Sequence, residues 1–208
     1  MGLVRRASEP PPAGERRERP RDPAALVAAL SHASADVRRW AALDLAGDAA
    51  AVGPLAARLS VEGDQAVREA LLSTLAGIGG ADVVGELVPY LRCEDATVRN
   101  AVVAGLGQIR ASADAVPALL ADPDADVRVL TVMLLGLLRD PRVPGWLAGV
   151  VATDCDANVC GAAISQLAEV GDETVCAVIE AAAARFAGDP FVAFAARTSV
   201  ARLADGAR

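Results

Sequence analysis

A valine that recurs six times constrains the fold of this chain more than any other feature. Successive copies are separated by 30, 31, 29, 32 and 33 residues, and a Leu or Val follows eight positions after each copy. A period of about 31 residues is typical of arrays in which structural units stack on one another. The recurring residues are Val37, Val67, Val98, Val127, Val159 and Val192.

The copy at 121–147 shows what one unit contains. Asp122-Pro123-Asp124 is a helix-start signal, because a carboxylate accepts the free N–H groups of a first turn and Pro fixes φ there. Apolar residues then recur at three- and four-residue spacing up to Leu135, which indicates a helix with one buried face. Asp140-Pro141 ends this helix, and a second begins near Val143. Such a hairpin cannot bury its own apolar face, so it must stack on neighbours.

The composition favours packed helices. Apolar residues make up 53% of the 208 residues and aromatic residues only 3%, so the core must consist mainly of Ala, Val and Leu. Together with the period, this predicts an all-α, right-handed solenoid of about six helical hairpins. Every basic residue is an arginine, which we interpret as the codon bias of a GC-rich bacterial genome. The net charge of −7 argues against general binding to a phosphate backbone.

The periodicity places two helices in each repeat. We expect the first helices over 23–31, 49–59, 81–92, 113–121, 142–153 and 173–186. We expect the second helices over 36–46, 64–78, 96–109, 125–138, 157–170 and 190–204. Glycines are placed to end or tighten the second helices at Gly47, Gly77, Gly107, Gly136 and Gly171.

Residues 1–21 differ from the rest, because they are rich in Arg and Pro and lack apolar periodicity. Six Arg and three Glu give them a charge of +3, which leaves −10 on the remainder. We predict a disordered tail over 1–21 and a solenoid over 22–206. An electrostatic arm, a phosphorylation site at Ser8 and a start codon assigned too far upstream are alternatives. Without a secretion signal or a membrane span, we expect a cytoplasmic protein with reduced cysteines.

The repeat pattern D-x-x-V-R-x-x-A-x-x-x-L-G, followed by a short turn and x-V-P-x-L, resembles HEAT repeats. It is most similar to the short HEAT-like repeats of phycobilisome (bilin) lyases, over about residues 22–206. The resemblance implies that the second helices line the concave side of the solenoid. It fixes no function, since such repeats occur in scaffolds, adaptors, lyase subunits and hydroxylases.

The resemblance also implies a role for the arginine after each recurring valine. In HEAT-type arrays a carboxylate of one repeat commonly meets an arginine of the next, and the guanidinium suits this role by its fixed fork of donors. We therefore expect a structural ladder, with contact to an anion as the alternative. Because Cys160 and Ala193 replace the arginine, the C-terminal end should be looser or differently packed. The ladder residues are Asp36, Arg38, Arg68, Arg99, Asp126 and Arg128, with Asp95 as a further partner.

Helical spacing predicts which residues face outward from the second helices. If positions three, four and eight after the recurring valine face the core, then positions two and six face the concave side. Exposed apolar groups beside polar ones would suit a peptide or a helix. Alternatively, a rotation of the helix partly buries Val129 and Met133. The predicted contacts are Arg39, Glu69, Ser73, Asn100, Val129 and Met133.

Few residues suggest catalysis. His32 is the only histidine, which excludes His-rich zinc centres and the paired His-Glu iron sites of HEAT-repeat hydroxylases. A four-thiolate zinc site would need Cys93, Cys155, Cys160 and Cys176 to converge from three repeats, so small buried residues are the favoured interpretation. We therefore predict no catalytic residue, no metal and no cofactor.

The sequence favours a non-enzymatic adaptor that binds another protein through the concave face in a bacterial cytoplasm. A bilin-lyase-like or tetrapyrrole-chaperone subunit is the alternative, and it would need a partner chain. A DNA-lesion-binding repeat protein is less favoured, because Trp40 and Trp146 lie in an acidic solenoid. We expect neither a nucleic-acid nor a membrane partner.

Overall fold

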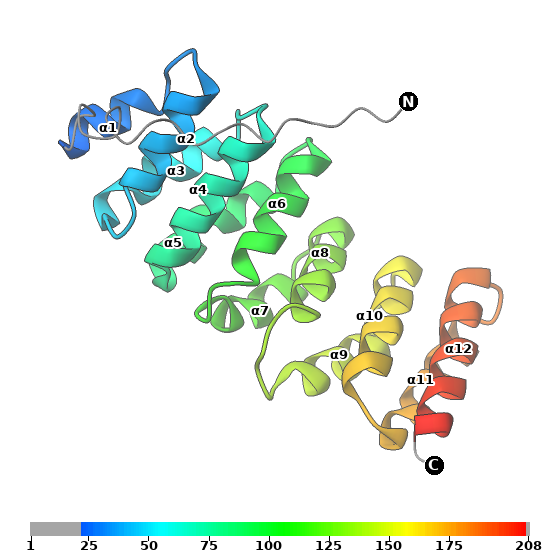
Figure 1. Ribbon diagram of the computed structural model, residues 1–208. Helices are drawn as coiled ribbons and strands as arrows, with labels where there is room; N and C mark the ends of the chain where they lie inside the picture. Colours follow the sequence, from blue (N-terminus) through cyan, green and yellow to red (C-terminus); the bar gives the residue numbers. More distant parts are fainter. Residues whose placement is uncertain (1–21, 207–208) are drawn as a thin grey trace, which may run out of the picture.

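The computed structural model describes residues 22–206, and these form an α-solenoid of stacked helical hairpins (Figure 1). Within this range there are twelve α-helices, three short 3-10 helices and no strand. The predicted all-α solenoid is thus confirmed. The predicted disordered tail, 1–21, lies outside the described residues.

Each hairpin consists of an odd-numbered and an even-numbered helix. The odd-numbered helices are α1 (Pro23–Ala29), α3 (Val52–Leu59), α5 (Gly80–Leu87), α7 (Ser112–Leu120), α9 (Val143–Thr153) and α11 (Cys176–Arg185). The even-numbered helices are α2 (Ala35–Asp44), α4 (Gln65–Ile78), α6 (Ala96–Leu106), α8 (Ala125–Leu135), α10 (Ala157–Val170) and α12 (Pro190–Gly206). Short 3-10 helices adjoin α3, α5 and α11 at η1 (Ala49–Ala51), η2 (Val88–Arg92) and η3 (Glu173–Val175).

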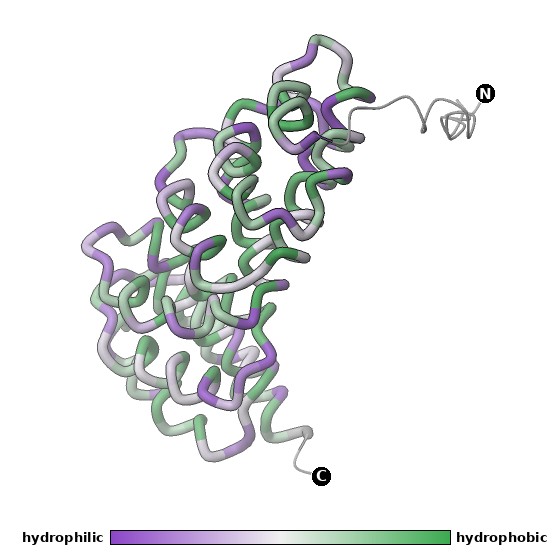
Figure 2. Tube along the Cα trace, turned by 90° about the vertical axis from the view of Figure 1, so that its left-hand side faces the viewer, coloured by the Kyte–Doolittle hydropathy of each residue, from purple (hydrophilic) through white to green (hydrophobic). Residues whose placement is uncertain are grey.

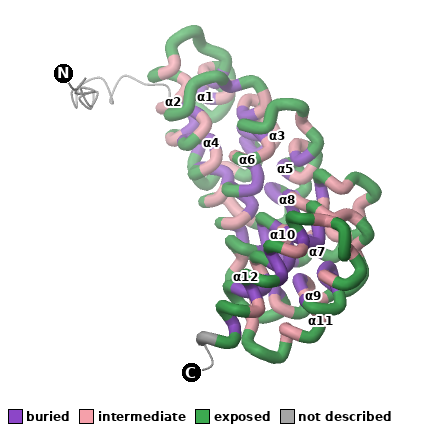
Figure 3. Tube along the Cα trace, turned by 90° about the vertical axis from the view of Figure 1, so that its right-hand side faces the viewer, coloured by how far each residue is buried: buried purple, intermediate pink, exposed green. Residues whose placement is uncertain are grey.

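The array is curved, and the even-numbered helices lie along the inner side of the curve (Figure 3). Each even-numbered helix packs against the next one, from α2 on α4 to α10 on α12. The odd-numbered helices cover the outer side. Because the even-numbered helices form one continuous layer, their outward side chains make up a single concave surface.

Aspartates start most of the even-numbered helices. Asp64 accepts hydrogen bonds from the backbone N–H groups of Ala66 (2.9 Å) and Val67 (3.1 Å), and its equivalents Asp95, Asp124 and Asp156 also cap their helices. Such a cap contributes about 1 kcal/mol to helix stability. The hydrophilic residues therefore gather at the turns of the chain (Figure 2).

The core consists of Ala, Val and Leu, as the composition predicts. The recurring valines of repeats two to six are fully or almost fully buried. The leucines eight positions after the recurring valine are also buried in repeats one to five, from Leu45 to Leu167. Val37, in the first repeat, is exposed instead. The reason is that α2 is the first of the even-numbered helices and has none before it to cover that side.

The turn from α4 to α5 depends on Gly79 rather than on Gly77. Gly79 adopts φ 65° and ψ −165° at the end of α4, in a region that L side chains rarely enter. Gly77 lies within the last turn of α4, exposed, where a Cβ would meet nothing within 4 Å. Of the two roles expected for Gly77, to end or to tighten the helix, the first therefore falls to Gly79, and α4 ends at Ile78 as the periodicity predicts.

We predict that Gly79→Ala lowers the free energy of unfolding by about 1–3 kcal/mol, because alanine is strained at that φ and ψ. The matched variant Gly77→Ala should be neutral or stabilising by up to about 1 kcal/mol, since it removes a glycine from a helix. Urea denaturation of both variants measures the difference. Equal losses in the two variants would contradict this role for Gly79.

Candidate protein-interaction site

The predicted concave-face contacts all lie on even-numbered helices. Glu69, Ser73 and Asn100 are exposed on α4 and α6. Arg39 is half-buried on α2, and its guanidinium lies 5.1 Å from the centre of the Trp40 ring. The structure therefore places the polar candidates along the inner side of the curve.

The apolar candidates lie further along the same face, on α8. Val129 is half-buried, and Met133 is 43% exposed. The alternative of partial burial therefore holds for Val129, whereas Met133 remains exposed. Met133 is therefore the more exposed of the two predicted apolar contacts.

Sequence reasoning missed some exposed apolar side chains. Phe191 packs on Gly161 of α10, in the space that a Cβ would take, and remains half exposed. Phe194, which the outward spacing does indicate, is 60% exposed on the last helix. Leu137 is 51% exposed just after α8, and its Cβ lies 2.7 Å from the position of a Cβ on Gly107. A glycine leaves room for a large side chain of a neighbouring helix, so Gly107 and Gly161 were the sequence signal for the positions of Leu137 and Phe191.

The four arginines of the predicted ladder first bind their own turns. Each donates from Nη1 to the carbonyl six residues earlier: Arg38 to His32 (2.9 Å), Arg68 to Glu62 (2.7 Å), Arg99 to Cys93 (2.6 Å) and Arg128 to Asp122 (2.9 Å). Charged donors make strong hydrogen bonds to such carbonyls. The arginines therefore fix the turn between the two helices of a hairpin.

Two of these arginines also bind a carboxylate of the next repeat. Arg38 binds Glu62 through Nε (2.7 Å) and Nη2 (2.8 Å), and Arg128 binds Asp154 through Nε (2.8 Å) and Nη2 (3.1 Å). Both carboxylates lie two residues before the cap of the next even-numbered helix, and each also accepts that cap residue's N–H. These bonds join consecutive repeats.

The predicted partners of the ladder need correction. Asp36 and Asp126 are exposed in the first turns of α2 and α8. Asp95 caps α6; the cap hydrogen bond lowers its pKa, and the charge of Arg68 in the preceding repeat acts in the same direction. Of the three predicted partners, this one therefore interacts electrostatically with a ladder arginine. Among the described residues, the carboxylates that bind the ladder arginines are Glu62 and Asp154 instead. A helical side chain points back toward the N-terminus of its helix, so these arginines reach the turns rather than the helices.

The buried carboxylate of Glu62 is strongly stabilised in its charged form. The hydrogen bond from Arg38 lowers the pKa of Glu62 to about 2, and the Asp64 N–H and Arg58 act in the same direction. Burial opposes this shift and raises the pKa. Arg58 reaches the carboxylate from α3, with its Nε 2.9 Å from Oε2. Glu62 thus connects three elements at one buried point.

The C-terminal end is differently packed rather than looser. Cys160 replaces the ladder arginine, and Arg185 reaches in from α11 to donate to the carbonyls of Val151 (2.8 Å), Ala152 (2.6 Å) and Asp154 (3.1 Å). The Asp154 carbonyl is six residues before Cys160, where a ladder arginine would donate. Cys160 is fully buried, and this burial raises the pKa of its thiol.

Neither the histidine nor the cysteines form a recognisable metal site among the described residues. His32 accepts a hydrogen bond from the N–H of Ser34 at Nδ1 (3.0 Å), so it replaces the carboxylate found at this position in other turns. The four cysteines are free thiols. Across residues 22–206, no group of three or more His, Cys, Asp or Glu side chains could hold a metal ion. None of the helices described is long and apolar enough to cross a membrane.

A groove runs along three of the turns that join an even-numbered helix to the next odd-numbered one, those after α4, α6 and α8. One cleft, of about 540 Å³, lies between the turns at 107–111 and 136–142, and a second, of about 560 Å³, continues to the turn at 76–80. The two clefts share Gln108, Ile109, Arg110 and Asp140. We call this continuous feature the turn groove. It lies beside the concave face and was not predicted.

Comparison with known proteins identifies the repeats. The family model described as HEAT repeats matches residues 52–121 and 113–201. The chain belongs to the HEAT-repeat family. The resemblance inferred from the repeat pattern is therefore confirmed.

A curated relative and two solved structures are similar to this HEAT-repeat chain. The uncharacterized phycocyanin operon protein Z of Pseudanabaena tenuis (strain PCC 7409) is 26% identical over 186 residues, 84% of this chain and 91% of that protein. An engineered protein is 21% identical over 87% of this chain and 96% of its own, with a TM-score of 0.40. The complex of CpcE and CpcF of phycocyanin lyase from Nostoc sp. PCC7120 is 17% identical over 98% and 99%, with a TM-score of 0.36.

We predict that Glu62→Gln lowers the free energy of unfolding by about 3 kcal/mol, because it breaks a buried ion pair and leaves Arg38 without its counter-charge. Glu169→Gln is the matched control, since Glu169 pairs with Arg202 where both side chains are more than half exposed. That loss should be less than about 1 kcal/mol. Similar losses in urea denaturation would contradict the structural role of Glu62.

The stabilisation by Glu62 should depend on pH. The pKa of this carboxyl is about 2 in the folded chain against an ordinary 4.5, so the folded state binds fewer protons in that range. Its contribution is fully present above about pH 4.5 and is lost as the pH falls toward about 2. The difference in stability between the wild type and Glu62→Gln should thus shrink between pH 5 and pH 2. A constant difference would contradict the assignment.

Proposed function

We propose that this chain is a non-enzymatic adaptor that binds another protein through the concave face of the HEAT-repeat solenoid, in a bacterial cytoplasm. The contacts are Arg39, Glu69, Ser73, Asn100, Val129 and Met133. The exposed apolar side chain of Met133, on the same layer of helices as the exposed polar side chains of Glu69, Ser73 and Asn100, carries the proposal. Apolar groups with polar neighbours on a concave helical surface suit a peptide or a helix of a partner.

The few hydrogen bonds that the polar contact residues form within the fold support this proposal. Ser73 and Asn100 form no side-chain hydrogen bond with another described residue, and Glu69 accepts one only from Gln65 on its own helix (3.0 Å). Their side chains therefore contribute little to holding the repeats together. They remain available to a partner, in contrast to the ladder arginines on the same helices.

A bilin-lyase-like or tetrapyrrole-chaperone subunit is the second candidate. It is favoured by the curated relative, whose name places it in a phycocyanin operon. The concave face and a partner chain would both belong to that function as well. A DNA-lesion-binding protein is disfavoured by the net charge of −7, which repels a phosphate backbone.

We predict that Glu69→Lys combined with Met133→Asp weakens capture of the partner by at least about tenfold, because it reverses one charge and places another at the exposed apolar position. The matched control is Glu86→Lys combined with Val61→Asp, which makes the same exchanges at exposed positions on α5 and in the turn before α4. Affinity purification and calorimetry with the captured protein measure the effect, with circular dichroism as a folding check.

Two outcomes would contradict the adaptor assignment. Capture that survives in the double variant, or that is lost equally in the control, would show that the concave face is not the binding surface. A coloured preparation that carries a stoichiometric tetrapyrrole would instead support the lyase-like subunit.

A further inference from the structure

The turn groove contains two arginines that form no hydrogen bond or ion pair with another described residue, although the pKa of Asp140 is lowered by hydrogen bonds from Arg142 and also by the charge of Arg110. Residues 22–206 include thirteen arginines, and ten of them form a hydrogen bond, an ion pair or a ring contact with another described residue. The other three are Arg110, Arg139 and Arg197. Arg110 and Arg139 both line the cleft between the turns at 107–111 and 136–142. The unused guanidinium groups are thus concentrated in one place.

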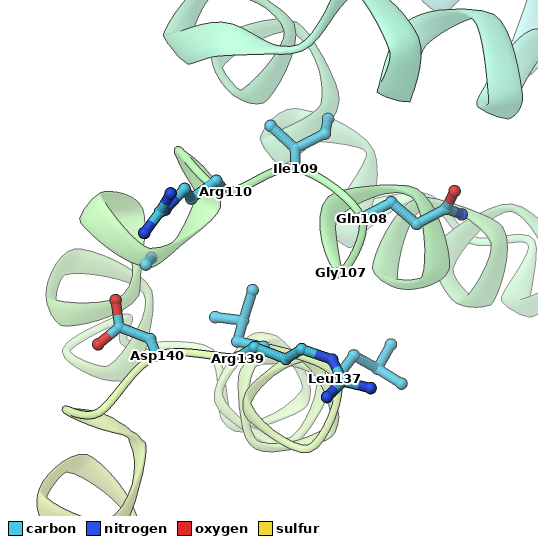
Figure 4. Close-up of a pocket in the computed structure, with 9 residues that line it drawn as sticks. Gly107, Gln108, Ile109, Arg110, Leu137, Arg139 and Asp140 are labelled. Atoms are coloured by element: carbon cyan, nitrogen blue, oxygen red, sulfur yellow. The ribbon is translucent and has the colours of Figure 1, made fainter.

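The two arginines lie at different ends of this cleft. Figure 4 shows the Arg110 guanidinium on the side of Asp140 and that of Arg139 beside Leu137, whereas the Ile109 side chain points away from this space and is buried in the core. Leu137 is half exposed, and both arginines are exposed. The cleft therefore presents two exposed arginines together with one exposed apolar side chain, that of Leu137.

The carboxylates in the groove are already bound. Asp140 accepts hydrogen bonds from Arg142 at Nε (2.9 Å), Nη2 (2.8 Å) and the backbone N–H (2.8 Å). Arg142 also reaches Asp114 at 3.4 Å and lies over the Trp146 ring, 4.7 Å from its centre. With three arginines against two aspartates, the groove carries a charge of +1 on a chain whose net charge is −7.

We infer that the turn groove binds an extended acidic peptide segment, with an apolar side chain on Leu137 and carboxylates on Arg110 and Arg139. The length of the groove supports an extended chain. Packed helices lie roughly 8–10 Å apart, so three turns span roughly 20 Å, which about six extended residues cover. This surface is separate from the concave-face residues, so the inference does not depend on the proposed function.

The test uses a fluorescein-labelled peptide with a central Leu-Phe pair flanked by glutamates, and fluorescence anisotropy with the full chain. Saturable binding that weakens with added salt is expected, because exposed ion pairs are screened. Arg110→Ala combined with Arg139→Ala should weaken binding by about tenfold, since each exposed pair contributes up to about fivefold. Leu137→Ala, added to the double variant, should weaken binding further. A peptide with glutamines in place of glutamates should bind the wild-type chain about as weakly as the glutamate peptide binds the double variant.

The matched control is Arg197→Glu, which changes the net charge by the same two units at the third unused arginine, on α12. It should leave the affinity within about twofold of the wild type. Circular dichroism and thermal melting establish that all variants fold alike. The inference is overturned if the peptide does not bind saturably, if the glutamine peptide binds as well, or if Arg197→Glu weakens binding as much as the double variant.

Discussion

The solenoid depends on how the turn within each hairpin is satisfied. In that turn, backbone carbonyls just before an even-numbered helix have no partner within the helix. A partly buried carbonyl that lacks a hydrogen-bond donor costs free energy. An arginine four residues after the cap supplies the donor in the first four repeats, at Arg38, Arg68, Arg99 and Arg128. Where Glu62 or Asp154 follows in the next repeat, the same guanidinium joins two repeats. Arg185 supplies the donors where Cys160 has replaced the arginine.

This arrangement decides which side chains remain for binding. The even-numbered helices are held side by side by their buried faces and by their turns, so their remaining faces form one concave surface (Figure 3). Glu69, Asn100 and Met133 lie there without a structural partner in a neighbouring repeat. The opposite ends of the same helices leave Arg110 and Arg139 unused in the turn groove. Both proposed binding surfaces thus consist of residues that the stacking does not require.

Periodicity predicted more of the fold than of the site. The range 157–170 coincides with α10, because a capping aspartate and a closing glycine mark both of its ends. The burial of Val127 and the exposure of Met133 also follow from spacing on one helix. The partner of Arg38 could not be predicted in this way, because Glu62 lies 24 residues away in a turn. Arg185 and the turn groove were missed for the same reason, since both depend on contacts between different repeats. The functional contacts themselves stay a prediction.

Amide hydrogen exchange of the chain with and without its captured protein tests the central claim most directly. Binding through the concave face should slow exchange in α4, α6 and α8, whose outward residues would be covered. It should leave α3, α5 and α9, on the outer side of the curve, unchanged. Protection confined to those odd-numbered helices would contradict the account, because the partner would then occupy the convex side.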